Sequence, residues 1–362
     1  MIESLNQKAL EQLVSQGIIS TKTGEKAIGL IKQDVAHVTP WYVHLFSALG
    51  AWISAIVFLL FFALMKSFEL ESFLAISIVL LVAALTINNM TKSLPTYFSQ
   101  LLFILSITGH ILLIIGVEVI WNNNIVTSIV FIITSLLFLL LYKQDLHKFL
   151  SFQALIAGVL VLSYELGVID MIAPLIIVMI SIALTLLWLN ESNYLVQPFY
   201  HHYSIIKYAL VAALLLSTSY LSFKINLLVS DFWFATDWSY MVISATLFFM
   251  TAYLMINITQ RFSIKLASGV TIGLILLALL LSVLFYQTPA IMAALLILII
   301  GIERGSNMLV PLAVVALIYN LAHYYYNLDM TLLNKSLLLM ISGAVLLLSA
   351  VLVIKKGGSS NA

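Results

Sequence analysis

The sequence predicts an all-α protein, a polytopic integral membrane helix bundle of about 12 transmembrane helices with both termini in the cytoplasm. First, 63% of its 362 residues are hydrophobic and 9% are charged, whereas soluble domains are roughly half apolar and about a quarter charged. Second, apolar runs of about twenty residues, long enough to cross a hydrocarbon core of roughly 30 Å, alternate with short polar breaks. Third, lysine and arginine gather in alternate breaks.

Composition also excludes several classes of function. The net charge is +1, so the chain has no basic footprint for nucleic acid, and we expect no nucleic-acid partner. Because there is no cysteine, disulfides, thiolate catalysis, cysteine-ligated zinc and iron–sulfur clusters are excluded. No phosphate loop, dinucleotide fingerprint or hydrolase motif occurs. We therefore expect no catalytic, cofactor-binding or metal-binding residues, no cofactor, and no enzyme activity.

The chain divides by composition into three parts. Residues 1–44 are mixed polar and apolar, with apolar residues at helical spacing, and we interpret them as a cytoplasmic helical hairpin and an interfacial entry segment. The transmembrane bundle is expected over 45–354, and 355–362 form a cytoplasmic tail. The first apolar run, Leu45–Met65, is long enough to span and should act as an uncleaved targeting signal.

The apolar runs define twelve candidate spans. They are 45–65, 70–88, 99–120, 125–142, 149–167, 171–189, 205–223, 239–258, 266–286, 289–302, 308–322 and 335–354. Two of them, 289–302 and 308–322, are short for a crossing. These two are either tilted neighbours in a thinned region or a re-entrant pair.

The distribution of basic residues predicts the orientation. With the N-terminus inside, thirteen basic residues lie on the inner side and three on the outer side. The inner ones are Lys8, Lys22, Lys26, Lys32, Lys92, Lys143, Lys148, Lys207, Arg261, Lys265, Arg304, Lys355 and Lys356, and the outer ones are Lys66, Lys224 and Lys335. Cytoplasmic loops carry an excess of lysine and arginine, so both termini should be inside.

The C-terminal third carries a recognisable pattern. It reads Gly301-Ile-Glu-Arg-Gly-Ser-Asn307, then an apolar run, then His323-Tyr-Tyr-Tyr-Asn-Leu-Asp-Met-Thr-Leu-Leu-Asn-Lys-Ser336. This pattern resembles a bacterial polytopic membrane family, domain of unknown function 4401, whose signature pairs a G-x-x-R-G-N-like turn with YYY-x-L-x-x-TLL-x-KS. The turn departs from that signature, because Ser306 stands between Gly305 and Asn307. The N-terminal part is similar to a related family, domain of unknown function 2157. The resemblances imply a protein of the bacterial cytoplasmic (inner) membrane and no established activity.

The densest polar and aromatic segment is expected at the outer face. Its candidate functional residues are Tyr324, Tyr325, Tyr326, Asp329, Thr331 and Lys335. If Thr331 caps the last span, Lys335 falls in its first turn, where a cation opposes the helix dipole. Lys335 then needs a partner, either Asp329 or an anionic ligand or lipid headgroup. The alternative is a belt of tyrosines with a snorkelling lysine.

Glu303 and Arg304 lie between the two short runs, framed by glycines. The pair could form the tip of a re-entrant loop that lines a cavity. The alternative, which the orientation rule favours, is an ordinary tight inner turn.

His110 lies midway along its run, one turn from Ser106. An ionisable group at that depth marks a pathway or proton relay, or else hydrogen-bonds a neighbouring helix. Gly269 and Gly273 form a G-x-x-x-G motif that favours close helix packing.

Three functions remain. The first is a transporter- or flippase-like protein for a small or lipid-linked solute, favoured by many spans with short loops. The second is a non-transporting envelope scaffold or sensor that acts through a membrane or envelope protein partner. An intramembrane enzyme is the least favoured, because no acid–base or metal constellation is visible. In each case the surrounding partner is the lipid bilayer.

Overall fold

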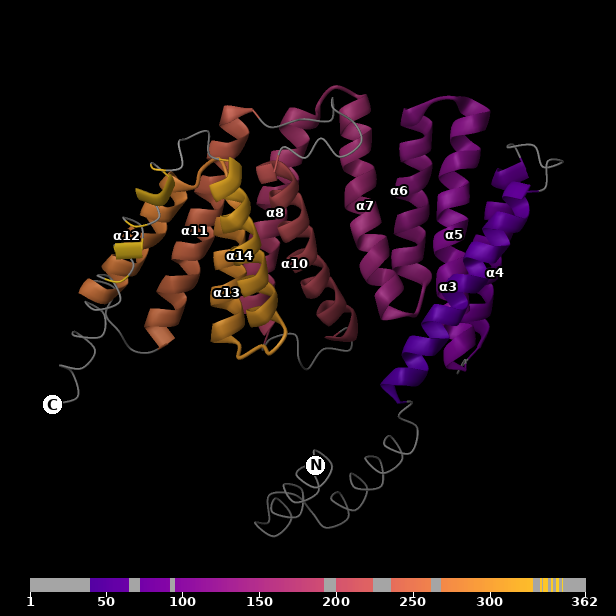
Figure 1. Ribbon diagram of the computed structural model, residues 1–362, viewed down its shortest axis with the longest axis horizontal. Coiled ribbons are helices and arrows are strands. Elements are labelled where there is room, and N and C mark those ends of the chain that lie inside the picture. Colours follow the sequence, from indigo (N-terminus) through magenta and orange to yellow (C-terminus); the bar gives the residue numbers. More distant parts are fainter. Residues whose placement is uncertain are drawn as a thin grey trace, which may run out of the picture. The chain divides into compact units, whose positions relative to one another are not determined.

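The computed structural model is all-helical in the part of the chain that it describes (Figure 1). The described residues are 40–64, 72–91, 95–191, 200–223, 236–261 and 268–327, with 333, 335–337, 340, 343, 344 and 347. The expected N-terminal hairpin, most of the last span, the C-terminal tail, Asp329 and Thr331 lie outside these residues.

Eleven helices occupy the described residues. They are α3 (Trp41–Leu64), α4 (Ser72–Met90), α5 (Thr96–Trp121), α6 (Asn124–Leu141), α7 (Asp145–Glu165), α8 (Ile169–Leu189), α10 (Tyr200–Phe223), α11 (Asp237–Arg261), α12 (Gly269–Leu284), α13 (Pro289–Glu303) and α14 (Leu309–Asn327). Each coincides with one of the apolar runs in the sequence. Within the described residues, eight helices are long and apolar enough to cross a membrane, and three apolar helical stretches are shorter. The number of spans and the orientation stay predictions.

One boundary differs from the expectation. The run expected over 308–322 continues as α14 to Asn327, so the tyrosines at 324–326 form the last turns of this helix. The pair α13 and α14 packs side by side in the structure. The first of the two remains short, at 15 residues, or about 22 Å of helix. Ten of its residues are buried, so α13 is covered by other helices along most of its length.

The chain forms two compact units, residues 1–112 and 113–362, and the division falls within α5. In the first unit, Ala51 and Ala55 of α3 pack against Phe103 and Ile104 of α5. Gly109 lies against α4, since a Cβ placed there would stand 2.9 Å from Leu81.

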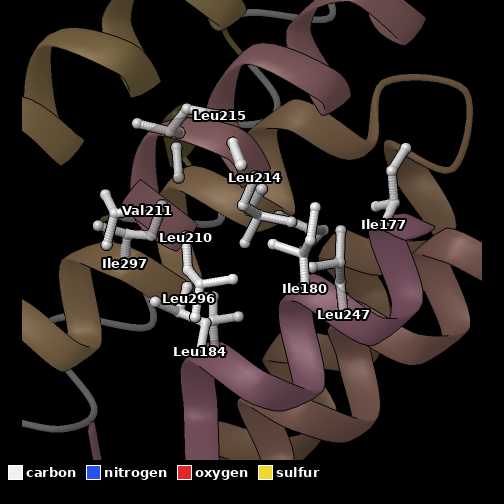
Figure 2. Close-up of a cluster of buried hydrophobic side chains, with 14 of the residues drawn as sticks. Ile177, Ile180, Leu184, Leu210, Val211, Leu214, Leu215, Leu247, Leu296 and Ile297 are labelled. Atoms are coloured by element: carbon white, nitrogen blue, oxygen red, sulfur yellow. The ribbon is translucent and has the colours of Figure 1, made fainter. Parts of the chain in front are cut away.

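In the second unit, α8, α10, α11 and α13 enclose the main apolar core, and α7 packs against α8 and α10. Figure 2 shows the centre of this core, with Ile180 and Leu184 of α8 facing Leu210 and Leu214 of α10. Polar side chains add cross-links toward one end of the helices. Ser222 Oγ accepts from the Ala290 amide at 3.3 Å, and Tyr240 donates to the Leu221 carbonyl at 3.2 Å.

The turn between α5 and α6 depends on two asparagines. Asn122 has a φ of 45°, a left-handed conformation that asparagine tolerates better than most residues. The Asn123 side chain then accepts from the amides of Ile125 at 2.9 Å and Val126 at 3.3 Å. It is the N-cap of α6.

Asn123→Ala is therefore expected to lower the free energy of unfolding by about 1 kcal/mol, the usual cost of a lost N-cap. Thermal unfolding of the purified protein, followed by far-ultraviolet circular dichroism, measures the loss. Asn124→Ala, one residue inside the helix, is the control and should unfold like the parent. Equal losses from both substitutions would contradict the capping role.

Candidate functional site

The end of α8 carries a buried aromatic residue that holds a cation. Trp188 is 2% exposed, and the Lys207 Nζ of α10 lies 4.2 Å from the centroid of its ring. That distance is within the range of a cation–π interaction. Lys207 also forms an ion pair with Glu191, and the side chains of both residues are largely buried. The end of α8 is thus joined to the first turns of α10.

A second group of charges approaches the same residue from α13. The Arg304 Nη2 donates to the Trp188 carbonyl and to the Leu189 carbonyl, the latter at 3.0 Å. These carbonyls belong to the last turn of α8, where a cation is favoured by the helix dipole. Beside Arg304, Glu303 accepts from Arg261 of α11 at 2.6 Å, and its other oxygen lies 3.7 Å from the Arg304 Nε.

A tight turn places Arg304 there. The Ser306 amide donates to the Gly301 carbonyl at 2.9 Å, and the Gly305 amide donates to the Ile302 carbonyl at 3.2 Å. With Gly305 at a φ of 61°, this is a Schellman ending, in which glycine takes the left-handed position. Ser306 Oγ then accepts from the Leu309 amide at 3.3 Å and caps α14. The α13–α14 connection is thus a tight turn, a geometry that an ordinary inner turn and the tip of a re-entrant loop share, so these two alternatives stay predictions.

We call these residues the ion-pair cluster: Trp188, Glu191, Lys207, Arg261, Glu303 and Arg304. The cluster joins the ends of α8, α10, α11 and α13. Three buried atoms of the cluster have no hydrogen-bond partner among the described residues: Trp188 Nε1, Glu303 Oε2 and Arg304 Nε. The arrangement can hold four helix ends together by charge. The described residues contain no group of three or more histidine, aspartate and glutamate side chains that could hold a metal ion.

A cavity of about 330 Å³ lies between α7, α8 and α10. Its lining comprises Gln153, Ile156, Ala157, Leu160, Val161, Ala173, Ile176, Ile177, Leu216, Ser217 and Tyr220. Three lining side chains are open to the outside of the bundle, since Leu216 is 62% exposed, Val161 is 40% exposed and Ala157 is also exposed. The cavity therefore opens sideways, on the surface that would face lipid if these helices span a membrane.

Only three of the lining side chains carry a polar group: Gln153, Ser217 and Tyr220. Gln153 Nε2 donates to the Ala209 carbonyl of α10 at 2.8 Å, which ties α7 to α10 beside the cavity. An apolar pocket with few polar groups is typical of a site for an apolar ligand.

The structure brings part of the expected outer cluster together. Lys335 Nζ donates to the Tyr326 carbonyl at 3.2 Å and lies 5.7 Å from the centroid of the Tyr325 ring. Its partner in the described part of the chain is thus the end of α14, where a cation is favoured by the dipole. Tyr324 contacts Phe285 edge to face, with the ring centroids 5.0 Å apart.

His110 belongs to the first unit. Its Nδ1 lies 2.8 Å from the carbonyl oxygen of Ser106, one turn earlier in α5. The two residues share a helix face as expected, and the contact runs to the backbone of Ser106.

Sequence reasoning missed the pairing of Glu191 with Lys207, the central position of Trp188 and the whole cavity. One signal was present for the ion pair. Glu191 and Lys207 stand near the facing ends of two successive apolar runs, and antiparallel neighbours place such residues at the same level. The cavity had no such signal, because its lining is ordinary apolar sequence from three helices.

Comparison with known proteins identifies a family. The family model described as "Domain of unknown function (DUF4401)" matches residues 40–356. No curated protein and no solved structure matches the chain. The similarity of the N-terminal part to domain of unknown function 2157 stays a prediction.

Proposed function

The chain belongs to the family described as a domain of unknown function, DUF4401, and on that premise we propose a transporter- or flippase-like role in the bacterial inner membrane. The solute that the geometry favours is a lipid-linked one, or a small molecule with an apolar chain. No catalysis, metal or cofactor enters the proposal.

The observation that carries this proposal is the cavity between α7, α8 and α10. Its volume of about 330 Å³ lies in the range of ligand pockets, roughly 300–1,000 Å³. All three helices have the length and composition of membrane spans. A solute that enters from the lipid phase needs an opening on the side of the bundle, and the exposed Leu216 and Val161 stand at such an opening.

The lining also favours a lipid-linked solute over a free ion. Ions in transporters are held by carboxylates or by the freed backbone of broken helices, and the lining contains no carboxylate. A hydrocarbon chain needs only apolar walls, and the hydroxyls of Ser217 and Tyr220 offer hydrogen bonds to a polar group carried with it.

Ala157→Phe tests the proposal, because Ala157 is an exposed residue of α7 in the cavity lining. A phenyl ring there fills the cavity without entering the packed core. Native mass spectrometry of the purified protein should show bound phospholipid in the parent. Vesicles of phosphatidylethanolamine and phosphatidylglycerol with a fluorescent phospholipid then report movement between leaflets. We expect Ala157→Phe to lower the affinity for phospholipid and the rate of movement between leaflets by about tenfold each. A tenfold change in affinity corresponds to about 1.4 kcal/mol of binding free energy.

The matched control is Ala245→Phe, an exposed alanine of α11 outside the cavity lining, which should behave like the parent. A parent that moves no labelled lipid and copurifies with another protein in fixed stoichiometry would contradict the proposal. That result would favour the scaffold or sensor alternative.

A further inference from the structure

We propose that the ion-pair cluster is a releasable latch, which holds the ends of α8 and α10 together and keeps the lipid-facing cavity closed toward that side of the membrane. The inference rests on the proposed function, since a closed end matters only if the cavity exchanges a solute with the two sides in turn. It assigns a conformational role to Lys207, Glu191 and Trp188.

The latch and the cavity use the same two helices at different levels. Trp188 and Glu191 lie at the end of α8, and Lys207 lies near the start of α10. The cavity takes Ala173 to Ile177 from the beginning of α8 and Leu216 to Tyr220 from the later part of α10. Along each helix, the two sites are separated by about two to three turns.

The buried apolar side chains of α8 and α10 that lie between these two levels form a plug, and Figure 2 shows the cluster to which they belong. Ile180 and Leu184 of α8 face Leu210 and Leu214 of α10, and each of the four is at most 5% exposed. Ile177 belongs both to this core and to the cavity lining. The cavity can reach the latch side only if α8 and α10 move apart along this plug, and the contacts of Lys207 oppose that movement.

The chemistry of the cluster suits a contact that must be released. Well-packed apolar residues often stabilise as much as a buried ion pair, because the charges lose their hydration. Separated charges regain that hydration at a membrane surface, whereas separated apolar surfaces do not. Lys207 and Glu191 can therefore part at a lower cost than an apolar contact of the same size. Toward the opposite end of α10, the ties to α13 through Ser222 and to α11 through Tyr240 are neutral hydrogen bonds.

Trp188 contacts both α10 and the end of α13, so the latch involves three helices. Its ring lies against Lys207, and its backbone carbonyl accepts from Arg304. Movement of α10 away from α8 thus exposes the neighbour that also anchors α13. A substitution at Lys207 should therefore weaken both the contact with the Trp188 ring and the hydrogen bond from Arg304 to the Trp188 carbonyl.

The chain has no cysteine, so a single introduced cysteine can serve as a reporter. Its accessibility is measured as the rate of labelling by a charged, membrane-impermeant thiol reagent. Ser217→Cys reports the cavity, and Asn190→Cys, an exposed position beside the cluster, identifies the membrane face on which the latch lies. Lys207→Met keeps the aliphatic stem over Trp188 and removes the charge, and Glu191→Gln is the second variant. Asn307→Cys, exposed in the α13–α14 turn beside Arg304, is the control position.

With the latch intact, the Ser217→Cys reporter should react slowly from the latch face of oriented vesicles. Lys207→Met and Glu191→Gln should each raise that labelling rate by about tenfold. This is expected if the fraction of molecules in which α8 and α10 have moved apart rises from about 1% to about 10%. The rate at Asn307→Cys, which is exposed with or without the latch, should not change. If both variants melt at a lower temperature but leave the Ser217→Cys rate unchanged, the cluster only stabilises the bundle and the latch is wrong. If the rate rises while no labelled lipid moves, the latch stands and the proposed function fails.

Discussion

Gly158→Leu is expected to force α6 and α7 apart and to lower the free energy of unfolding by about 3 kcal/mol, the upper end of the usual cost of overpacking. A Cβ at this position would lie 2.8 Å from Ile132 Cγ1, 3.2 Å from Phe131 Cδ1 and 3.7 Å from the Ile132 amide nitrogen. Ile132 Cγ1 is held close to its own backbone, so the clash can be relieved only by moving the helices. Thermal unfolding in detergent micelles, followed by far-ultraviolet circular dichroism, measures the loss.

Gly273→Leu is the matched control. Gly273 also lies inside a helix, yet within the described part of the chain no atom stands within 4 Å of a Cβ placed there. Leucine should be neutral or stabilising at this position, because glycine costs a helix up to about 1 kcal/mol. Similar losses at both positions would mean that α6 and α7 do not approach each other at Gly158.

The glycines also bear on the G-x-x-x-G motif. The motif at Gly269 and Gly273 predicts close helix packing, but no atom of the described residues approaches a Cβ placed at Gly273. The close approaches occur instead at Gly109, Gly158 and Gly301, the last with Leu309 and Val310 at 3.1 Å. Small-residue spacing is common in apolar helices, so the motif alone does not say which glycine meets a neighbour.

Arg304→Ala is the second substitution with a large expected effect, a loss of about 3 kcal/mol in the free energy of unfolding. The arginine side chain is 19% exposed and joins α13 to the last carbonyls of α8. Its removal leaves the Trp188 and Leu189 carbonyls without this donor and takes one cation from the nearly buried Glu303. The same thermal unfolding experiment measures the change.

Arg261→Ala serves as the comparison within the same cluster. Its side chain is 53% exposed, so water screens the ion pair with Glu303, and the loss should stay within about 1 kcal/mol. Arg304→Lys should recover only part of the stability, because an ammonium lacks the planar fork of the guanidinium. Equal destabilisation by Arg304→Ala and Arg261→Ala would contradict the role given to Arg304.

The helices and their order could be predicted from the sequence because each depends on a local property. An apolar run of about twenty residues must satisfy its own backbone hydrogen bonds if it lies in lipid, and only a helix does so within one segment. The turn at Glu303 and Arg304 was also accessible, since glycine at 305 followed by a serine matches a helix ending and a new start. The end of α14 differs from the expectation, because the apolar run stops at 322 whereas the helix continues through the tyrosines to Asn327, and tyrosine does not break a helix.

Only the tertiary structure decided which faces of these helices meet. Most of them are apolar on every side, so no stripe in the sequence distinguishes a face that packs from a face turned outward. The cavity lining, the close approach at Gly158 and the place of Trp188 between Lys207 and Arg304 all depend on contacts between segments distant in the chain. Local composition thus determined that this chain forms membrane-length helices, while non-local packing decided where its cavity and its charges come together.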